Sequence, residues 1–290
     1  LESSIVSGVI VGEASGGDGE DSLYSIENII GSDFRDTLIG SMGINTIRGG
    51  AGNDTIDGKE GNDTLFGEAG NDLFKSGFGD NYIDGGTGNN TVDYSQVTYL
   101  NGVIVKLLSP TAVGLGETWG ESTSNSGNDR LVNIQNVIGT QYDDTFSGAD
   151  NTNNSFDGGA GGSDLVDYSY YKSNAITVNL DEGWATGQGT DSFKNIDAIR
   201  GTDILAFGDT LIGSSTQGNT LYGMAGNDII KGMGGNNSLY GGSGNDTIYS
   251  GKDDDFIDGG TGVDTVSYEE VTTGGVTVYL GKENISQNTI

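Results

Sequence analysis

A nine-residue repeat limits the folds available to this chain more than any other feature of its sequence. The hexad G-x-x-G-N-D begins at Gly49, Gly58 and Gly67. The same nine-residue phase extends over residues 31–93 and returns over residues 223–267. In both ranges the sixth residue of every unit is Asp or Asn, and the eighth is apolar. A fixed short period of this kind predicts stacked units rather than a globular core.

Each unit is predicted to be a loop of six residues followed by a strand of three. Glycine disfavours a helix and permits the positive φ angles of tight loops. A short strand with an apolar central residue points one side chain inward. Two units then make one turn of a flattened coil, and successive turns stack about 4.8 Å apart. The predicted fold class is therefore all-β: parallel β-roll (β-solenoid) blocks, with the eighth positions filling a narrow interior between two sheets.

This coil places each residue beside the residue eighteen positions later, so the sixth-position acids form ladders along both edges. Unit charges about 4.8 Å apart repel by roughly 1 kcal/mol even in water. A cation between turns would reverse the sign of this interaction, and Ca²⁺ takes about six to eight oxygens from carboxylates and backbone carbonyls. We therefore predict several calcium ions, each bound between loops eighteen residues apart.

The predicted ligands are the sixth-position side chains and the loop glycines. The side-chain ligands are Asp36, Asp54, Asp63, Asp72, Asn81, Asn90, Asp144, Asp164, Asp209, Asp228, Asn237, Asp246, Asp255 and Asp264. The glycines expected to supply carbonyl oxygens are Gly50, Gly52, Gly61, Gly70, Gly226, Gly235, Gly244 and Gly262.

The composition supports a cation-binding structure with a thin core. Apolar side chains make up 33% of the chain, and 53 of its 290 residues are glycine. The formal net charge is -30, and 30 of the 42 acids are the shorter Asp, which turns and tight metal loops prefer. This charge argues against nucleic-acid binding, which needs Lys and Arg. The lack of His and Cys excludes Ser-His-Asp and Cys-His catalysis, and no apolar stretch is long enough to span a membrane.

The repeats resemble the glycine-rich nonapeptide G-G-x-G-x-D-x-U-x of the RTX (repeats-in-toxin) calcium-binding family. GGAGNDTID from Gly49 and GGSGNDTIY from Gly241 fit this pattern, whereas Asn at the sixth position, as in Asn81, departs from it. The resemblance implies a chain that is disordered without calcium, leaves through the type I secretion machinery and folds outside the cell or at the bacterial cell surface. High acidity with few core residues independently favours disorder without metal, so metal binding would supply folding free energy.

The segments between the repeats are similar to the linkers between RTX blocks in adenylate cyclase toxin and large secreted bacterial adhesins. They contain V-D-Y-S from Val92 and Val166, a strand-like motif from Gly102 and Ala175, and L-V-N-I-Q-N-V-I-G from Leu131. The predicted organisation is a partial linker over 1–30, a first β-roll block over 31–93, a linker over 94–138, a short second block over 139–167, a linker over 168–200, a third block over 201–267 and a partial linker over 268–290. We expect the chain to be a piece of a longer array.

The predicted function is a non-enzymatic, calcium-binding structural module of a secreted toxin or adhesin. Two alternatives remain open. In the first, the linkers around Trp119 and Trp184 bind a cell-surface glycan or receptor, which glycan-array binding would favour. In the second, the chain is the carrier part of a secreted polysaccharide-modifying enzyme or lipase, which a catalytic domain elsewhere in the parent protein would favour. No catalytic residue is predicted, because the sequence has neither a G-x-S-x-G elbow nor a phosphate-binding loop.

Overall fold

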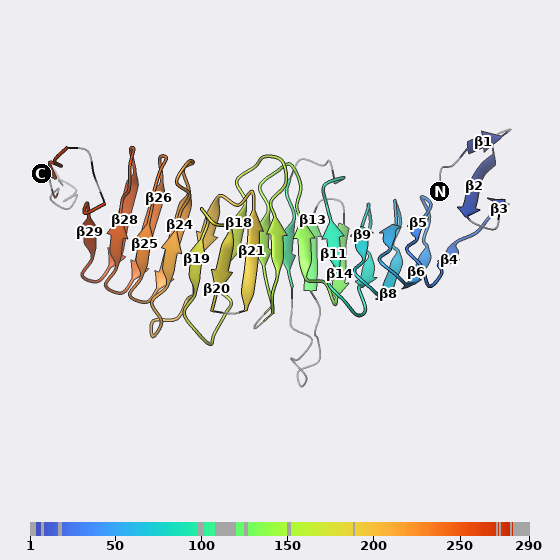
Figure 1. Cartoon of the computed structure of the whole chain (residues 1–290), viewed down its shortest axis with the longest axis horizontal. Coiled ribbons are helices and arrows are strands. Elements are labelled where there is room, and N and C mark those ends of the chain that lie inside the picture. Colours follow the sequence, from blue (N-terminus) through green and yellow to red (C-terminus); the bar gives the residue numbers. More distant parts are fainter. Residues whose placement is uncertain are drawn as a thin grey trace, which may run out of the picture.

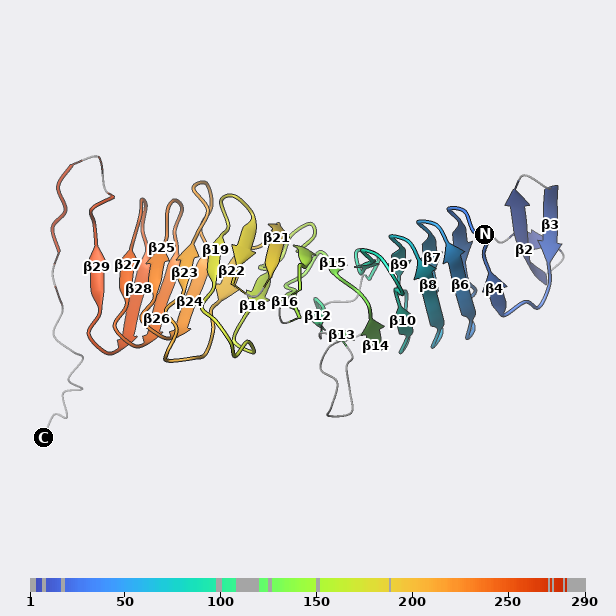
Figure 2. The same cartoon turned by 60° about the horizontal axis from the view of Figure 1, so that its bottom comes forward.

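The computed structural model of the chain is an elongated β-solenoid wound around one long axis (Figure 1, Figure 2). It describes residues 4–6, 9–16, 19–97, 101–107, 120–124, 127–149, 152–187, 189–270, 272, 274–278 and 280. These residues form strands, turns and loops; none of them lies in a helix, and so none lies in a helix that could cross a membrane. The predicted all-β class and parallel β-roll are confirmed.

Most strands have three residues, as the nine-residue unit predicts. The strands are β1 Ser4–Val6, β2 Val9–Gly16, β3 Gly19–Leu23, β4 Asn28–Ile30, β5 Thr37–Ile39, β6 Thr46–Ala51, β7 Thr55–Asp57, β8 Thr64–Ala69, β9 Leu73–Lys75, β10 Tyr82–Asp84, β11 Thr91–Asp93, β12 Ile104–Lys106, β13 Gly120–Ser124, β14 Gly127–Val132, β15 Asn136–Ile138, β16 Thr145–Ser147, β17 Ser155–Asp157, β18 Leu165–Asp167, β19 Thr177–Asn179, β20 Trp184–Thr186, β21 Thr190–Lys194, β22 Ala198–Arg200, β23 Thr210–Ile212, β24 Thr220–Ala225, β25 Ile229–Lys231, β26 Ser238–Ser243, β27 Thr247–Tyr249, β28 Phe256–Thr261 and β29 Thr265–Ser267.

Two sheets of 13 strands each form the walls of the solenoid. One runs in the order β28-β26-β24-β22-β18-β16-β12-β13-β14-β10-β8-β6-β4 and the other in the order β29-β27-β25-β23-β19-β20-β21-β17-β15-β11-β9-β7-β5. Within the repeats, neighbouring strands are parallel, and Ile47 pairs with Leu65 and Ile56 with Phe74. This is the eighteen-residue register that the repeat predicts. Strands β1 to β3 form a separate antiparallel sheet next to β4 (Figure 1).

The core is a single file of inward side chains between the two sheets. The eighth positions of the first repeat range, from Ile47 to Val92, are fully buried, and so are Ile230, Leu239 and Ile248 in the second. Each of these repeat strands therefore contributes one fully buried apolar side chain to a thin interior. Burying a side chain of this size stabilises the fold by about 1.5–3 kcal/mol.

Two antiparallel insertions interrupt the parallel order, one in each sheet. Strands β12 and β13 lie between β14 and β16 in the first sheet, and β19 and β20 lie between β21 and β23 in the second. Outside the insertions the coil continues directly, because β14 pairs in parallel with β10 and β15 with β11. Both sheets thus run without a break through the ranges 94–138 and 168–200 (Figure 2). Since each sheet receives one insertion, both keep the same number of strands.

Candidate metal sites

The sixth-position residues form a hydrogen-bonded ladder along each edge of the solenoid. The backbone N–H of Asp36 donates to Oδ1 of Asp54 at 2.8 Å, and that of Asp54 donates to Oδ1 of Asp72 at 2.9 Å. The N–H of Asp72 donates in the same way to Oδ1 of Asn90 at 2.9 Å. Because Asp and Asn both carry an Oδ1, either residue satisfies the backbone of the neighbouring turn. This explains why the repeat accepts both at this position.

The ladder continues through four side chains that were not among the predicted ligands: Asp129, Gln135, Asp191 and Asp197. Oδ1 of Asp129 accepts from the N–H of Asn81 at 3.0 Å, and Oε1 of Gln135 accepts from the N–H of Asn90 at 2.8 Å. Each of the four stands two residues before an inward apolar residue of a strand, as Asp129 stands before Leu131 in β14. That spacing is the signal that would have found them.

A second ladder, formed by the fifth position of the repeat, runs in the opposite direction. Here the side-chain oxygen accepts from the backbone of the following turn instead of the preceding one. Oδ1 of Asn53 accepts from the N–H of Asn71 at 2.8 Å, and Oδ1 of Asn71 accepts from the N–H of Asn89 at 2.8 Å. In the later repeats Oδ1 of Asn227 accepts from the N–H of Asn245 at 2.7 Å. The Asn before each acid is therefore a structural residue of the stack.

Five ladder carboxylates of the described residues have a second oxygen that is both buried and without a hydrogen-bond partner. They are Asp54, Asp63, Asp72, Asp228 and Asp246. All five side chains are buried, with 1% of their surface exposed. A buried polar atom without a partner is rare in folded proteins and costs about 1–3 kcal/mol, and more when it is charged. These oxygens are therefore the first candidates for a bound cation.

Each unpartnered oxygen lies against the first glycine of its loop, where a side chain would not fit. A Cβ on Gly49 would collide with Oδ2 of Asp54 and would lie 2.8 Å from the carbonyl oxygen of Gly67, one turn further along. The first residues of the other four loops have the same two kinds of neighbour. A carboxylate oxygen and a backbone carbonyl oxygen from the next turn thus lie on the same side of this glycine. This pair of hard oxygens fits the ligand preference of Ca²⁺.

The electrostatics of these carboxylates favour a nearby positive charge. Burial raises the pKa of Asp54, Asp72 and Asp246, that of Asp63 to about 6 and that of Asp228 to about 7. In each case a backbone N–H bond opposes the rise, and the charge of a neighbouring Asp adds to it. Desolvation disfavours the ionised form, so the metal-free fold stores an electrostatic cost at these loops.

We call the loops that hold these five acids the open loops: residues 49–54, 58–63, 67–72, 223–228 and 241–246. Their second residue has a positive φ even where it is not glycine, as in Lys59 (71°), Glu68 (73°) and Met224 (76°). The glycines predicted as ligands also have positive φ, from 77° at Gly235 to 141° at Gly70. The glycines of the repeat therefore allow a loop conformation that L-residues rarely adopt.

Six other loops are closed by the chain's own donors. We call residues 31–36, 40–45, 139–144, 148–154, 201–209 and 213–219 the closed loops. The N–H of Thr140 donates to Oδ2 of Asp144 at 2.6 Å, and that of Thr202 donates to Oδ2 of Asp209 at 2.6 Å. Ser32 bonds Asp36 in the same way. In Asp36, Asp144 and Asp209, Oδ2 therefore already accepts a hydrogen bond from a backbone N–H. This is the oxygen that has no partner in the open loops.

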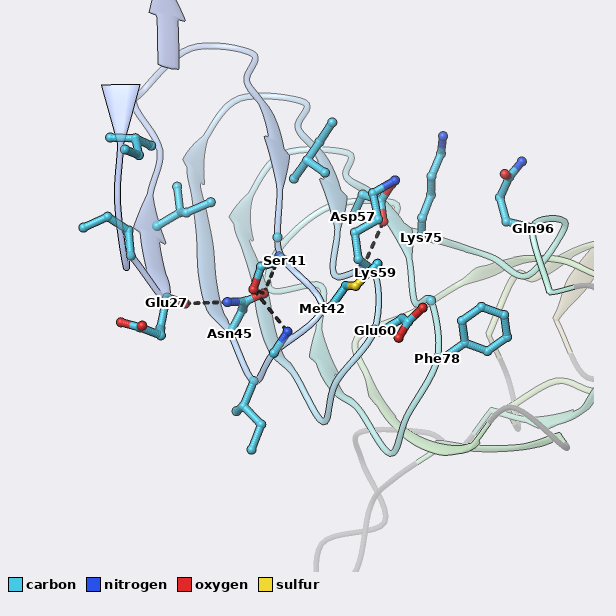
Figure 3. A pocket seen from close by; sticks show the side chains of 18 of the residues that line it. Glu27, Ser41, Met42, Asn45, Asp57, Lys59, Glu60, Lys75, Phe78 and Gln96 are labelled. Atoms are coloured by element: carbon cyan, nitrogen blue, oxygen red, sulfur yellow. Dashed lines mark hydrogen bonds and ion pairs between the residues drawn. The ribbon is translucent and has the colours of Figure 1, made fainter. Parts of the chain in front are cut away.

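Figure 3 shows one closed loop beside a pocket of about 850 Å³ at the N-terminal end of the roll. The N–H of Ser41 donates to Oδ1 of Asn45 at 2.7 Å, and Nδ2 of Asn45 donates to the carbonyl oxygen of Glu27 at 3.0 Å. The pocket lies against the same loop and includes an ion pair between Lys59 and Asp57 at 2.9 Å. In this loop an amide takes the place of the carboxylate, and no charge remains to be neutralised.

Two tyrosine hydroxyls donate hydrogen bonds to the ladder carboxylates next to the insertions. Oη of Tyr94 donates to Oδ2 of Asp129 at 2.9 Å, and Oη of Tyr168 donates to Oδ2 of Asp191 at 2.7 Å. Both tyrosines are buried, with 1% of their surface exposed. The V-D-Y-S motif therefore supplies a hydroxyl donor for the carboxylate oxygen that stays unpartnered in the open loops.

The other predicted ligands belong to loops that are neither open nor closed in the sense used above. Asn81, Asn90 and Asn237 are neutral ladder members, whereas Asp255 and Asp264 accept from Asn237 and Asp246 near the last turn. Burial raises the pKa of Asp164 to about 7. In the described part of the chain, no three His, Cys, Asp or Glu side chains converge on one point.

The two tryptophans proposed as ligand-binding residues are placed differently. Trp119 lies outside the described residues. Trp184, in β20, is half-buried, and its Nε1 donates to Oε2 of Glu182 at 2.6 Å. A glycan-binding role for these residues stays a prediction.

Comparison with known families gives one match. Residues 30–65, 57–92, 205–237, 214–248 and 231–266 match a family model described as the RTX calcium-binding nonapeptide repeat (4 copies). These segments contain all five open loops. A search of curated proteins found no match.

Proposed function

The two repeat blocks of this chain belong to the RTX calcium-binding nonapeptide repeat family, and on that premise we propose that the chain is a non-enzymatic structural module that completes its folding when the open loops bind calcium. The observation that carries this proposal is the set of five buried carboxylates with an unpartnered oxygen, each beside a carbonyl oxygen of the next turn.

The residues that would hold the cation are the ladder acid of an open loop and the loop carbonyls. In the first loop these are Asp54 and the carbonyl oxygen of Gly67, and in the fourth they are Asp228 and the carbonyl oxygen of Gly241. Bound Ca²⁺ would supply positive charge to oxygens that have no proton donor. The chain's own part is to hold these oxygens in place: the ladder bond fixes Oδ1, and the positive-φ loop positions the carbonyls.

The proposed setting is outside the cell. In solutions with little calcium the ionised acids of the ladders would repel each other and keep the repeat blocks unfolded, whereas calcium at extracellular levels would fold them. A chain with this property can pass the type I secretion machinery unfolded and fold after export. We therefore assign the module to a secreted or cell-surface bacterial protein, a toxin or an adhesin, that it stiffens after export.

The test is far-UV circular dichroism of the whole chain in EGTA, followed by a calcium titration with magnesium as control. We expect the β signal to rise cooperatively with calcium and to respond weakly to magnesium, which demands stricter octahedral geometry. A β signal that is the same in EGTA and in calcium would contradict the proposal.

A pair of matched variants separates site loss from charge loss. Substituting Asn at Asp54, Asp72, Asp228 and Asp246 should weaken the calcium response. The control substitutes Asn at four exposed acids outside the open loops: Asp21, Asp33, Asp203 and Asp254. Both variants lose the same formal charge, so equal calcium responses would mean that net repulsion, and not the open loops, senses calcium.

A further inference from the structure

We propose that two copies of this chain dock head to tail through the two ends of the solenoid. The N-terminal segment comprises the described residues from 9 to 30, and the C-terminal segment comprises those from 265 to 280. Each matches one part of the internal linkers at 94–138 and 168–200. The docking rests on the proposed function, because the repeat blocks that carry both segments fold with calcium, and it adds a partner to that function.

The sequence assigns the two segments to different parts of a linker. The C-terminal segment contains GVTVYL from Gly275, which matches GVIVKL from Gly102 and AITVNL from Ala175. The N-terminal segment contains LYSIENIIG from Leu23, which matches LVNIQNVIG from Leu131. In both internal linkers the first motif precedes the second along the chain. The C-terminal segment therefore corresponds to the earlier part of a linker, and the N-terminal segment corresponds to the later part.

The backbone of the N-terminal segment is that of an internal linker. Ser25 has a φ of 51°, and the matching residues Asn133 and Asn195 both have a φ of 54°. Positive φ values are uncommon for residues other than glycine, so the same turn occurs at the same place in all three motifs. The strand that follows each turn (β4, β15 or β22) pairs in parallel with a strand of the next turn of the solenoid.

The inward side chains of the C-terminal segment are exposed, although the same positions are buried in both internal linkers. Val278 is 50% exposed, whereas the matching Val105 and Val178 are buried. Leu280 is also exposed, whereas the matching Leu107 is buried. Neighbouring large apolar side chains that are exposed together mark an interaction surface.

The N-terminal segment exposes an apolar position in the same way. Ile26 is 52% exposed, whereas Ile134 and Ile196, at the same place in the internal linkers, are buried. Ile26 lines the pocket of about 850 Å³ at the N-terminal end, together with Ile29 and Ile39. This end of the solenoid therefore presents an apolar hollow at a position that is closed in the internal linkers.

The internal linkers show which strands cover these positions. β12 pairs antiparallel with β13 and parallel with β16, with Val105 opposite Phe146, and β19 pairs in the same way with β20 and β23. β2 corresponds to β13, because each forms a hairpin with the strand that carries the Leu of the second motif. β5 corresponds to β16, because each is the first strand after that motif. Residues 276–278 of one copy therefore fit between β2 and β5 of the other, with Val278 opposite Leu38.

Two further strand pairs complete the junction. β4 and β5 are the outermost strands of the two 13-stranded sheets at one end, and β28 and β29 are outermost at the other. Among the described residues, each of these strands thus has one edge without a neighbour in its sheet. At the first linker β10 pairs with β14 and β11 with β15. In the same register β28 of one copy pairs with β3 of the other, and β29 pairs with β4, which brings Val266 opposite Ile29.

The ladder of sixth-position acids also continues across the junction. The N–H of Val103 donates to Oδ1 of Asp144 at 2.7 Å, and the second linker has the equivalent bond at 2.9 Å. Asp36 follows the N-terminal motif at the position of Asp144, and Val276 takes the position of Val103 in the C-terminal segment. The N–H of Val276 in one copy is therefore the expected donor to Asp36 in the other.

A second copy supplies both of the missing neighbours. The two segments lie at opposite ends of the elongated solenoid (Figure 1, Figure 2), so they do not meet within one copy. Because the two docking surfaces differ, the contact is heterologous, and a dimer keeps one free surface at each end. Association therefore proceeds to open chains of copies instead of stopping at a dimer.

Sedimentation velocity of the full chain over about 1–100 μM, in calcium and in EGTA, tests the docking. In calcium we expect the average mass to rise with concentration beyond that of a dimer, and in EGTA we expect an unfolded monomer. A monomer at every concentration in calcium, with a β signal that still responds to calcium, would overturn the docking and leave the proposed function standing. Equal association in both solutions, with an unchanged β signal, would support the docking and contradict the proposed function.

Single charged substitutions locate the two surfaces. V278D should raise the concentration at which association is half complete at least roughly tenfold, because it buries a charge in the junction. T277D is the matched control, since it places the same charge on the neighbouring residue, whose equivalent Ile104 is exposed in β12. On the other surface I26D should act like V278D, and Y24D at an exposed position is its control. Equal effects of each substitution and its control would show that added charge, and not the docking surface, weakens association.

Mixing the two deficient variants tests the head-to-tail arrangement itself. V278D keeps the N-terminal surface and I26D keeps the C-terminal one, so each alone should stay monomeric at a concentration where the native chain associates. An equimolar mixture should form dimers with one copy of each variant and no longer chains. A mixture that stays monomeric, while both variants gain a β signal in calcium, would refute the proposal. Association of either variant alone to the extent of the native chain would refute it too.

Discussion

Replacing Asp228 by Asn separates the two tasks of a ladder carboxylate. Oδ1 of Asp228 accepts from the N–H of Asp209 at 2.7 Å, whereas Oδ2 has no partner. Asn keeps the first oxygen and substitutes an amide nitrogen for the second. At the equivalent place Asn237 donates Nδ2 to the carbonyl oxygen of Gly235 at 2.9 Å. In D228N the carbonyl oxygen of Gly226 is therefore the expected acceptor.

The magnitude follows from the cost of keeping this acid ionised. Burial raises the pKa of Asp228 from 3.8 to about 7. At about 1.36 kcal/mol per pKa unit, ionisation at pH 8 costs the metal-free fold at most about 4 kcal/mol. Screening by the solvent near the loop reduces this to about 2 kcal/mol, and D228N recovers that amount. D228A also removes the charge but leaves the N–H of Asp209 without its acceptor, which costs about 1–3 kcal/mol.

The assay is hydrogen exchange of β25 and β27 at pH 8, with and without calcium. In EGTA we expect D228N to be better protected than the native chain and D228A to be close to it. In calcium the order reverses, because D228N has lost a carboxylate ligand. At pH 5 the acid carries its proton in the fold but is ionised in the unfolded chain, so the difference in EGTA should shrink, and it should vanish only below pH 3.8. Lower protection of D228N in EGTA at pH 8 would refute the reasoning.

Three further predictions concern pH, the loop glycines and the core. The pKa values of Asp63 and Asp164 are raised in the fold to about 6 and about 7, from 3.8. The stability from these groups is therefore present below pH 3.8 and lost as the pH rises through 6 to 7. Lowering the pH from about 8 to about 5 in EGTA should increase the β signal in circular dichroism, and a decrease would show that other groups dominate. In calcium G70A should unfold at a urea midpoint corresponding to a loss of at least about 2 kcal/mol, because its φ is 141° and a Cβ would collide with a backbone carbonyl, whereas G43A should be tolerated. F74A, which empties a fully buried site, should cost about 3–5 kcal/mol in the same urea experiment, and a loss below about 1 kcal/mol would mean that the file of inward side chains does not stabilise the first repeat block.

The sequence alone determined the period, the winding and the interior of the solenoid. A unit of nine residues with one apolar position in phase leaves two units per turn as the natural solution, so the pairing of Ile47 with Leu65 follows from counting. The sixth-position ladder follows from the same register, and so does the burial of its members. These features depend on residues within one or two turns of each other, and local spacing encodes them.

The tertiary structure decided which acids need a cation. Asp54 and Asp129 both hold the same ladder bond, but the second oxygen of Asp129 meets the hydroxyl of Tyr94, 35 residues away, through an insertion that the period does not encode. One insertion adds β12 to the first sheet and the other adds β19 to the second. Their positions decide which turns of the solenoid receive additional buried side chains. Whether a loop is open or closed depends on where one N–H points, which is a property of backbone conformation and of packing between turns. Composition gave the chain many acids, and only the fold distinguished those with a donor from those without one.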